Sequence, residues 1–174
     1  MRPALTAPEP SPPRRARALT IIEAVIASGV VGVMLVAALG TVGATKTAEY
    51  RTADRLKGAM LAQSLMSEIV QQPYQDPGLL PLFGHELGES SATRIDCNDV
   101  DDYHGWDASP PQYKDGTVIP NATNWRTTVT VEKVKPANLN QSSLLDSGVR
   151  KITVIVKHNN ATMAALVCIR SNAR

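Results

Sequence analysis

The sequence predicts an α+β fold in which a long N-terminal helix packs on a small antiparallel β-sheet. Two observations predict it: a continuous helical pattern over residues 19–72, and alternation of β-branched and polar residues in the C-terminal third. The 174-residue chain is long enough for one domain of ordinary size. Its hydrophobic content of 43% argues against a chain that is disordered throughout.

The N-terminal part indicates a membrane segment. Residues 1–13 are rich in proline and show no hydrophobic period, so we expect them to be disordered. Residues 19–44 are almost wholly apolar, with Glu23 as the only charge, and exceed the ~20 residues that a bilayer requires. Four arginines precede them: Arg2, Arg14, Arg15 and Arg17. The positive-inside rule therefore predicts a single span with a cytoplasmic N-terminus and the rest of the chain across the membrane.

The helical pattern continues beyond the apolar run. Strong helix formers dominate residues 46–72, and Pro73 is expected to stop the helix. Gly58 is the one weak position in this pattern. Apolar residues recur every three to four positions: Leu56, Ala59, Ala62, Met66 and Ile69. We therefore expect one helix over residues 19–72, whose second half presents an apolar stripe to a domain.

Residues 73–174 are expected to form the head domain. Pro, Gly, Asp and Ser dominate residues 73–124, which is typical of a long irregular connection. Alternation predicts strands at 125–134, 149–157 and 162–169, and the sequence HNNA between the last two predicts a hairpin turn. The pattern favours three or four antiparallel strands packed on the helix stripe.

Charge and motif content exclude several functions. Residues 19–174 contain 14 of the 18 basic and 15 of the 16 acidic residues, so they are nearly neutral. Without a basic patch that includes aromatic residues, we expect no nucleic-acid partner. His85, His104 and His158 are scattered, and no catalytic motif surrounds them, so we expect no enzyme. His104 follows Asp101 and Asp102 closely, and a hydrogen-bonded loop histidine is favoured there over a metal or acid–base site.

The sequence RARALTIIEAVIA, from Arg15 to Ala27, places Ala18 before Leu19 and then a TIIE tetrapeptide that opens the apolar run. This pattern resembles the N-terminus of type IV pilins and type II secretion pseudopilins, in which a small residue at the cleavage point precedes a sequence like FTLIE. Ala18 replaces the usual glycine and Leu19 the usual phenylalanine. The resemblance extends over residues 14–72 and implies a pilin-like fold.

The resemblance also implies how the chain is processed and used. Prepilin peptidase would remove residues 1–18 by cutting between Ala18 and Leu19, and the new amino group of Leu19 would be methylated. The product would insert in the inner membrane with its C-terminal domain in the periplasm. It would then join other pilins or pseudopilins through an inner-membrane assembly platform, with membrane lipid around its apolar helix. In this class the acid at the position of Glu23 pairs with the amino group of a neighbouring subunit; alternatively, Glu23 reaches the membrane interface.

Small residues interrupt the apolar run. The pairs Ser28 and Gly32, and Gly40 and Ala44, have the four-residue spacing that lets membrane helices approach closely. Gly40 and Gly43 occupy the region where pilins often carry a helix-breaking glycine or proline. The alternative is that small residues are simply common in membrane helices.

The sequence DCNDVDDYHGW, from Asp96 to Trp106, is the second segment of interest. Its oxygen-bearing residues suggest calcium ligation as one interpretation and an Asx-rich turn as the other: Asp96, Asn98, Asp99, Asp101 and Asp102. We expect no other cofactor. With the following SPPQYKDG, the segment resembles a stretch in minor pilin-like proteins of the mannose-sensitive haemagglutinin pilus system. This resemblance favours a minor subunit.

Two points stay open from the sequence. Cys97 and Cys168 form no CxxC motif, and in an extracytoplasmic domain they would be either a disulfide or two free thiols. Small residues over 38–44 would also suit an ordinary signal peptidase, so a secreted binding domain is an alternative function. A single-pass anchor for an unrecognised domain is another.

Overall fold

The computed structural model describes residues 20–76, 83–86 and 88–172. The chain divides into two compact units, residues 1–47 and 48–174. Helix α1, Ile21–Val70, has 50 residues and is shared between the units. The predicted helix is thus confirmed over its described length, and it ends two residues before the predicted boundary; Leu19 lies outside the described residues.

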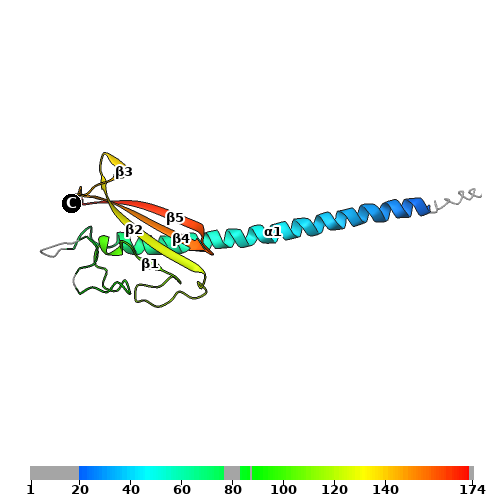
Figure 1. Ribbon diagram of the computed structural model, residues 1–174. Helices are drawn as coiled ribbons and strands as arrows, with labels where there is room; N and C mark the ends of the chain where they lie inside the picture. Colours follow the sequence, from blue (N-terminus) through cyan, green and yellow to red (C-terminus); the bar gives the residue numbers. More distant parts are fainter. Residues whose placement is uncertain (1–19, 77–82, 87, 173–174) are drawn as a thin grey trace, which may run out of the picture. The chain divides into compact units, whose positions relative to one another are not determined.

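The second unit contains a five-stranded antiparallel sheet (Figure 1). The strand order is β1-β2-β4-β5, and β3 pairs with the end of β2. The strands are β1 (Asp107–Ala108), β2 (Trp125–Lys135), β3 (Asn138–Ser142), β4 (Val149–His158) and β5 (Ala161–Ser171), with a short 3-10 helix η1 (Asp101–Tyr103) before them. The α+β prediction is confirmed, although the sheet has one strand more than the three or four expected. Strand β1 is two residues long and every residue of β3 is exposed, so neither shows the alternation that marks a strand.

The hairpin between β4 and β5 has the turn that the sequence predicts. Asn159 and Asn160 both have positive φ, 48° and 64°, as the two central residues of a type I′ turn require. Asparagine tolerates this backbone region better than most residues. His158 and Ala161 face each other across the turn, which sets the register of the hairpin.

The hydrophobic core lies between the sheet and the second half of α1. Side chains alternate along β2 and β4, so that one face of the sheet is apolar and buried. The buried residues of this face include Val129, Val131, Ile152, Val154 and Val156. Ala62, Leu65 and Ile69 of α1 pack in the same cluster. Burial of this apolar surface is the main force that holds the second unit together.

The predicted helix stripe is only partly correct. Ala62 and Ile69 are buried as expected, but Leu56 and Ala59 are exposed. Gly58 and Leu65 take their place on the buried face. A Cβ atom at Gly58 would lie 2.6 Å from the Cβ atom of Met163, so the absence of a side chain lets α1 approach β5. A pattern of apolar side chains does not count a glycine, which explains why the stripe was misplaced.

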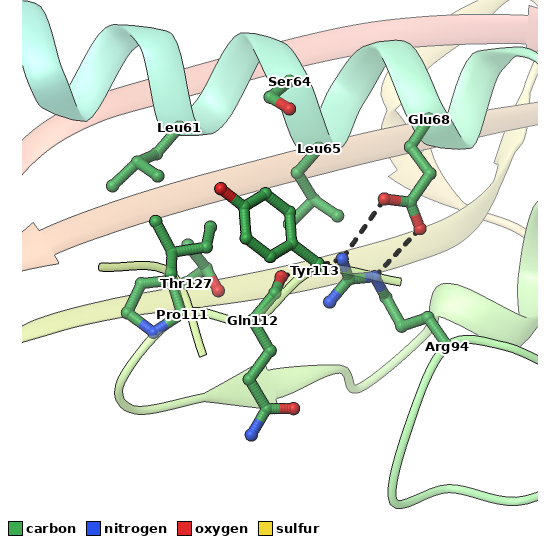
Figure 2. Close-up of a pocket in the computed structure, with 10 residues that line it drawn as sticks. Leu61, Ser64, Leu65, Glu68, Arg94, Pro111, Gln112, Tyr113 and Thr127 are labelled. Carbon is green, nitrogen blue, oxygen red and sulfur yellow. Dashed lines mark hydrogen bonds and ion pairs between the residues drawn. The ribbon is translucent and has the colours of Figure 1, made fainter. Parts of the chain in front are cut away.

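The long connection between α1 and β2 is tied to the helix by a buried arginine. The Arg94 side chain is 3% exposed, and its Nε and Nη2 donate to Oε1 and Oε2 of Glu68 at 3.0 and 3.2 Å (Figure 2). The Tyr103 hydroxyl donates to Oε1 of the same glutamate at 3.0 Å. The Arg94 guanidinium also lies over the ring of Trp106, 4.8 Å from its centroid. The segment predicted to be irregular is therefore anchored to α1 by charge-assisted hydrogen bonds.

A second buried arginine joins the sheet to η1. Arg150 of β4 is 2% exposed, and its Nη1 lies 2.5 Å from Oδ1 of Asp101, which is 1% exposed. Its guanidinium also lies over the ring of Tyr74, 4.6 Å from the centroid. The Tyr74 hydroxyl in turn donates to Asp146 at 2.6 Å. The ion pair between Arg150 and Asp101 connects the start of β4 with the acidic run.

Candidate functional site

The first half of α1 is an apolar surface that no other described residue of the chain covers. Every residue from 20 to 50 is exposed, including large apolar side chains such as Ile21 (86%) and Val33 (71%). Helix α1 is long and apolar enough to cross a membrane, and it is the one candidate span among the described residues. Exposed apolar surface of this extent marks a site of contact with lipid or protein.

The hydroxyl groups of this half are satisfied within the helix. Ser28 donates to the carbonyl oxygen of Val25 at 2.9 Å, and Thr41 donates to that of Ala38 at 2.7 Å. Thr45 donates in the same way to Thr41 at 2.9 Å. Such internal bonds remove the penalty of placing a hydroxyl group in hydrocarbon.

Glu23 is different, because its carboxylate has no hydrogen bond or ion pair with any residue that the structure describes. It is exposed in the first turn of α1, and its backbone N–H donates to the Thr20 hydroxyl oxygen at 3.3 Å. Thr20 thus caps the helix, a role that the Thr-x-x-Glu spacing could have revealed. The positive end of the helix dipole also favours an acid at this position. Ala18 and Leu19, the predicted cleavage pair, lie outside the described residues.

The small residues of this half face open space. A Cβ atom added at Gly32, Gly40 or Gly43 would meet nothing within 4 Å. Helix α1 also continues without a break through Gly40 and Gly43. The structure therefore leaves the surface around Ser28 and Gly32 free for contacts outside the chain, and the role of these residues in helix packing stays a prediction.

The acidic run of the head does not gather around one point. Asp96 is exposed and accepts the N–H of Ser90 at 3.1 Å. Asp101 is paired with Arg150. Among the described His, Cys, Asp and Glu residues, three form a group that could hold a metal ion. Asp102 is the one member of the acidic run in that group.

The remaining members of the run organise the loop itself. Asp99 is fully buried, and its Oδ1 accepts the N–H groups of Asp101 and Asp102 at 2.8 and 3.2 Å. Asp102 accepts the N–H of Asn98 at 2.8 Å. Burial, together with the negative charges of Asp101 and Asp102, raises the pKa of Asp99 to about 7. These contacts fit the interpretation of the run as an Asx-rich turn.

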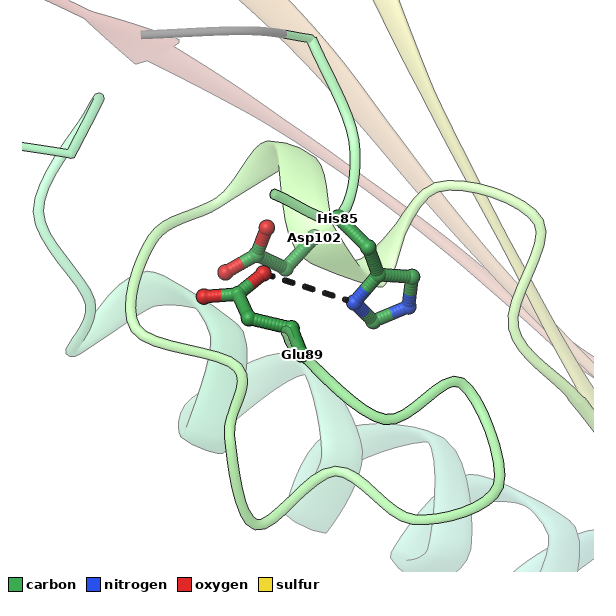
Figure 3. Close-up of side chains that lie close together, drawn as sticks. All are labelled: His85, Glu89 and Asp102. Atoms are coloured by element: carbon green, nitrogen blue, oxygen red, sulfur yellow. Dashed lines mark ion pairs between the residues drawn. The ribbon is translucent and has the colours of Figure 1, made fainter. Parts of the chain in front are cut away.

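A separate cluster of His85, Glu89 and Asp102 lies beside η1 (Figure 3). Each of the three residues offers one potential ligand atom, and these three atoms all lie within 4.8 Å of one another. Glu86 adjoins them, and its pKa is raised to about 7. The causes are burial, a hydrogen bond from protonated Glu86 to Glu89, and the negative charge of Asp102. The sequence places His104 close to Asp102 and favours a loop histidine there; it does not single out His85, the histidine that lies beside Asp102. The i, i+4 spacing of His85 and Glu89 was the available signal.

The other histidines and the cysteines have structural surroundings. The Val131 N–H donates to Nδ1 of His104 at 3.2 Å, so His104 is a hydrogen-bonded loop residue. Cys97 and Cys168 are both free thiols in the structure, and the disulfide alternative is not formed. Cys97 is buried, and burial, strengthened by the negative charge of Asp102, raises the pKa of its thiol to about 12. The thiolate form is therefore disfavoured at neutral pH.

The cavity between α1 and the connection offers no substrate site. It has a volume of about 40 Å³ and is lined by Leu61, Leu65 and the Glu68–Arg94 pair, among others (Figure 2). One water takes about 30 Å³ in the liquid, so this cavity suits a solvent molecule and nothing of substrate size.

Taken together, the described residues form a pilin-like architecture: a long, apolar N-terminal helix packed by its second half on a small antiparallel sheet. No protein-family model matches the chain, and neither does any curated protein or solved structure. The architecture and the chemistry of its exposed residues are therefore the basis for a functional assignment.

Proposed function

We propose that this chain is a minor pilin or pseudopilin, a subunit that contributes to assembly and not to catalysis. Its apolar helix half is anchored in the inner membrane, and its head domain lies in the periplasm. After prepilin peptidase has cut between Ala18 and Leu19, the subunit joins other pilins or pseudopilins through an assembly platform. The assembly is a type IV pilus or a type II secretion pseudopilus.

The observation that carries this proposal is the unpaired carboxylate of Glu23 on an exposed apolar helix. In hydrocarbon such a group costs several kcal/mol unless it finds a partner. Its own chain offers none among the described residues, whereas the hydroxyl groups nearby are satisfied internally. A positive amine on the first residue of a neighbouring subunit would supply the missing charge.

The division of α1 supports the same proposal. The second half is held by the head through Ala62, Leu65 and Ile69. The first half is exposed and has no such contacts with the residues that the structure describes, and its open glycine surfaces suit close approach of other helices. A subunit that bundles through one helix half while it displays a folded head needs this division.

The intact mass of the mature protein, extracted from membranes, tests the processing step. We expect a chain that begins at N-methyl-Leu19. A chain that begins near Thr41 or Thr45 would instead support a secreted domain behind an ordinary signal peptide. An unprocessed chain that retains Met1 would support a plain membrane anchor, and either result would overturn the proposal.

Substitution of Glu23 tests the pairing step. We expect Glu23→Gln and Glu23→Ala to leave membrane insertion and leader cleavage intact but to lower incorporation into filaments by at least about tenfold, because a desolvated charge pair is lost. Incorporation is measured as the ratio of sheared filament to membrane pool on immunoblots.

Thr20→Val is the matched control, because it weakens the helix start while it leaves the carboxylate in place. We expect near-normal incorporation of this variant. Equal loss in Thr20→Val and Glu23→Gln would show that Glu23 serves to initiate the helix, and normal entry of Glu23→Ala would contradict pairing altogether.

A further inference from the structure

Three side chains of different chemistry converge beside η1: His85, Glu89 and Asp102 (Figure 3). The Nδ1 atom of His85 lies 3.7 Å from Oε2 of Glu89, and both side chains are partly shielded from solvent, with exposed fractions of 24% and 13%. Asp102 is 1% exposed. An imidazole and two carboxylates within 4.8 Å of one another can reach one ion after small side-chain adjustments, because zinc lies about 2 Å from each of its nitrogen and oxygen ligands.

Several polar atoms of this cluster are buried without a hydrogen-bond partner among the described residues. They include Nδ1 of His85 and Oδ1 of Asp102. Each such atom carries a desolvation penalty, larger for charged groups, when nothing replaces its water. Several buried and unpaired polar atoms in one place indicate that a ligand, such as an ion, binds there.

We propose that His85, Glu89 and Asp102 bind one divalent transition-metal ion, for which Zn²⁺ is the best fit, with the fourth coordination position open to water. The site would link the segment around residues 85–89 to η1. This inference does not depend on the proposed function, because it concerns only the packing of the head.

The donor set favours zinc over calcium. Zinc takes imidazole nitrogen and carboxylate oxygen in a four-coordinate site, whereas calcium takes six to eight oxygen ligands. One nitrogen and two carboxylates, with water in the fourth position, match the donor set of an open zinc site. A 2+ ion would also offset the mutual repulsion of the three neighbouring acids, Glu86, Glu89 and Asp102.

The surrounding hydrogen bonds hold two of the carboxylates in place. The Asn98 side-chain amide donates to Oε1 of Glu89 at 2.9 Å. The backbone N–H groups of Asn98 and Asp99 donate to Oδ2 of Asp102 at 2.8 and 3.1 Å. Oε2 of Glu89 accepts the backbone N–H of Glu86 at 2.9 Å, and Oδ1 of Asp102 has no hydrogen-bond partner among the described residues. Oriented ligands of this kind are typical of metal sites, since such outer contacts fix the ligand geometry.

Metal titration of the full-length, tag-free protein in detergent tests the site. The protein is stripped with EDTA, and ZnCl₂ or CaCl₂ is added in an isothermal titration calorimeter. We expect one Zn²⁺ per chain and weaker binding of Ca²⁺. X-ray absorption spectra of the zinc-loaded wild-type protein should show the scattering of one imidazole, a signature that needs no variant.

His85→Gln should weaken zinc binding by about tenfold or more. His158→Gln is the matched control, because His158 pairs with Asp54 away from the cluster, and Asp96→Asn controls for exposed acids of the run. Both should bind zinc as the wild type does. Tryptophan fluorescence confirms that each variant is folded. The proposal would be overturned if the wild type bound no zinc or if His85→Gln bound it as tightly as the wild type. It would also be overturned if either control lost zinc binding to the same extent, or if the absorption spectrum showed oxygen ligands alone.

Discussion

The two halves of α1 belong to one continuous helix, yet they stand in opposite relations to the rest of the chain. In residues 21–47 every side chain is exposed, although most of them are apolar. In residues 48–70 the apolar face formed by Gly58, Ala62, Leu65 and Ile69 is buried on the sheet. The second half completes a core, whereas the first half exposes apolar surface of the kind that contacts lipid or protein.

Polar and small residues repeat this contrast. The carboxylate of Asp101 in the head is buried and paired with Arg150, whereas that of Glu23 has no partner among the described residues. Gly58 lies against Met163, whereas Gly40 faces open space. If the contrast is correct, matched substitutions in the two halves will have different effects on the stability of the head. Both tryptophans, Trp106 and Trp125, are buried in the head, so their fluorescence reports its unfolding alone.

The carboxylates give the largest expected difference. Asp101→Ala leaves the guanidinium of Arg150 buried without its partner at 2.5 Å, and we expect the free energy of unfolding to fall by about 3–5 kcal/mol. Glu23→Ala should leave it unchanged. Urea titration of the full chain in detergent, followed by tryptophan fluorescence, measures both. A stable Asp101→Ala variant would show that the ion pair does not hold η1 to β4.

Buried and exposed isoleucines give the next difference. Ile69 is fully buried between α1 and the sheet, so Ile69→Ala creates a cavity and should lower the free energy of unfolding by about 2–5 kcal/mol. Ile26 is 61% exposed in the first half, and Ile26→Ala should have no effect on the urea midpoint. If the two substitutions had equal effects, the first half of α1 would have to be part of the head's core, which contradicts the comparison.

The sequence predicted the parts of this fold that depend on local pattern. The apolar run, the strands at 125–134, 149–157 and 162–169 and the turn at Asn159 and Asn160 all agree with the structure, because each depends on neighbours a few residues apart. Contacts between distant segments were missed. Arg94 and Glu68 are 26 residues apart in the chain, and no pattern in either segment points to the other.

The candidate sites divide in the same way. Thr20 and Glu23 are three residues apart, and their capping pattern can be recognised in the sequence. The cluster at His85 needed the fold, because η1 brings Asp102 to a segment that precedes it by many residues. The sequence left calcium ligation and an Asx-rich turn as two interpretations of the acidic run, and the fold shows its members with different partners: Arg150 for Asp101 and backbone N–H groups for Asp99 and Asp102.

The glycines give the smallest expected difference and the sharpest form of the comparison. Gly58→Ala should improve helix propensity by about 1 kcal/mol, but the new Cβ atom would lie 2.6 Å from that of Met163. Overpacking of this kind costs about 1–3 kcal/mol, so we expect a net loss of stability in the urea titration. Gly40→Ala makes the same chemical change where nothing lies within 4 Å, and it should leave the head unaffected.

The double variant Gly58→Ala, Met163→Gly removes the clash while it keeps the alanine. Relative to Met163→Gly alone, the alanine should then be neutral or stabilising, because only its helix propensity remains. A persistent loss in that background would mean that Gly58 is required for a reason other than the approach of β5. If the alanine is neutral or stabilising in the Met163→Gly background, contact with the sheet is the property that distinguishes the second half of α1 from the first.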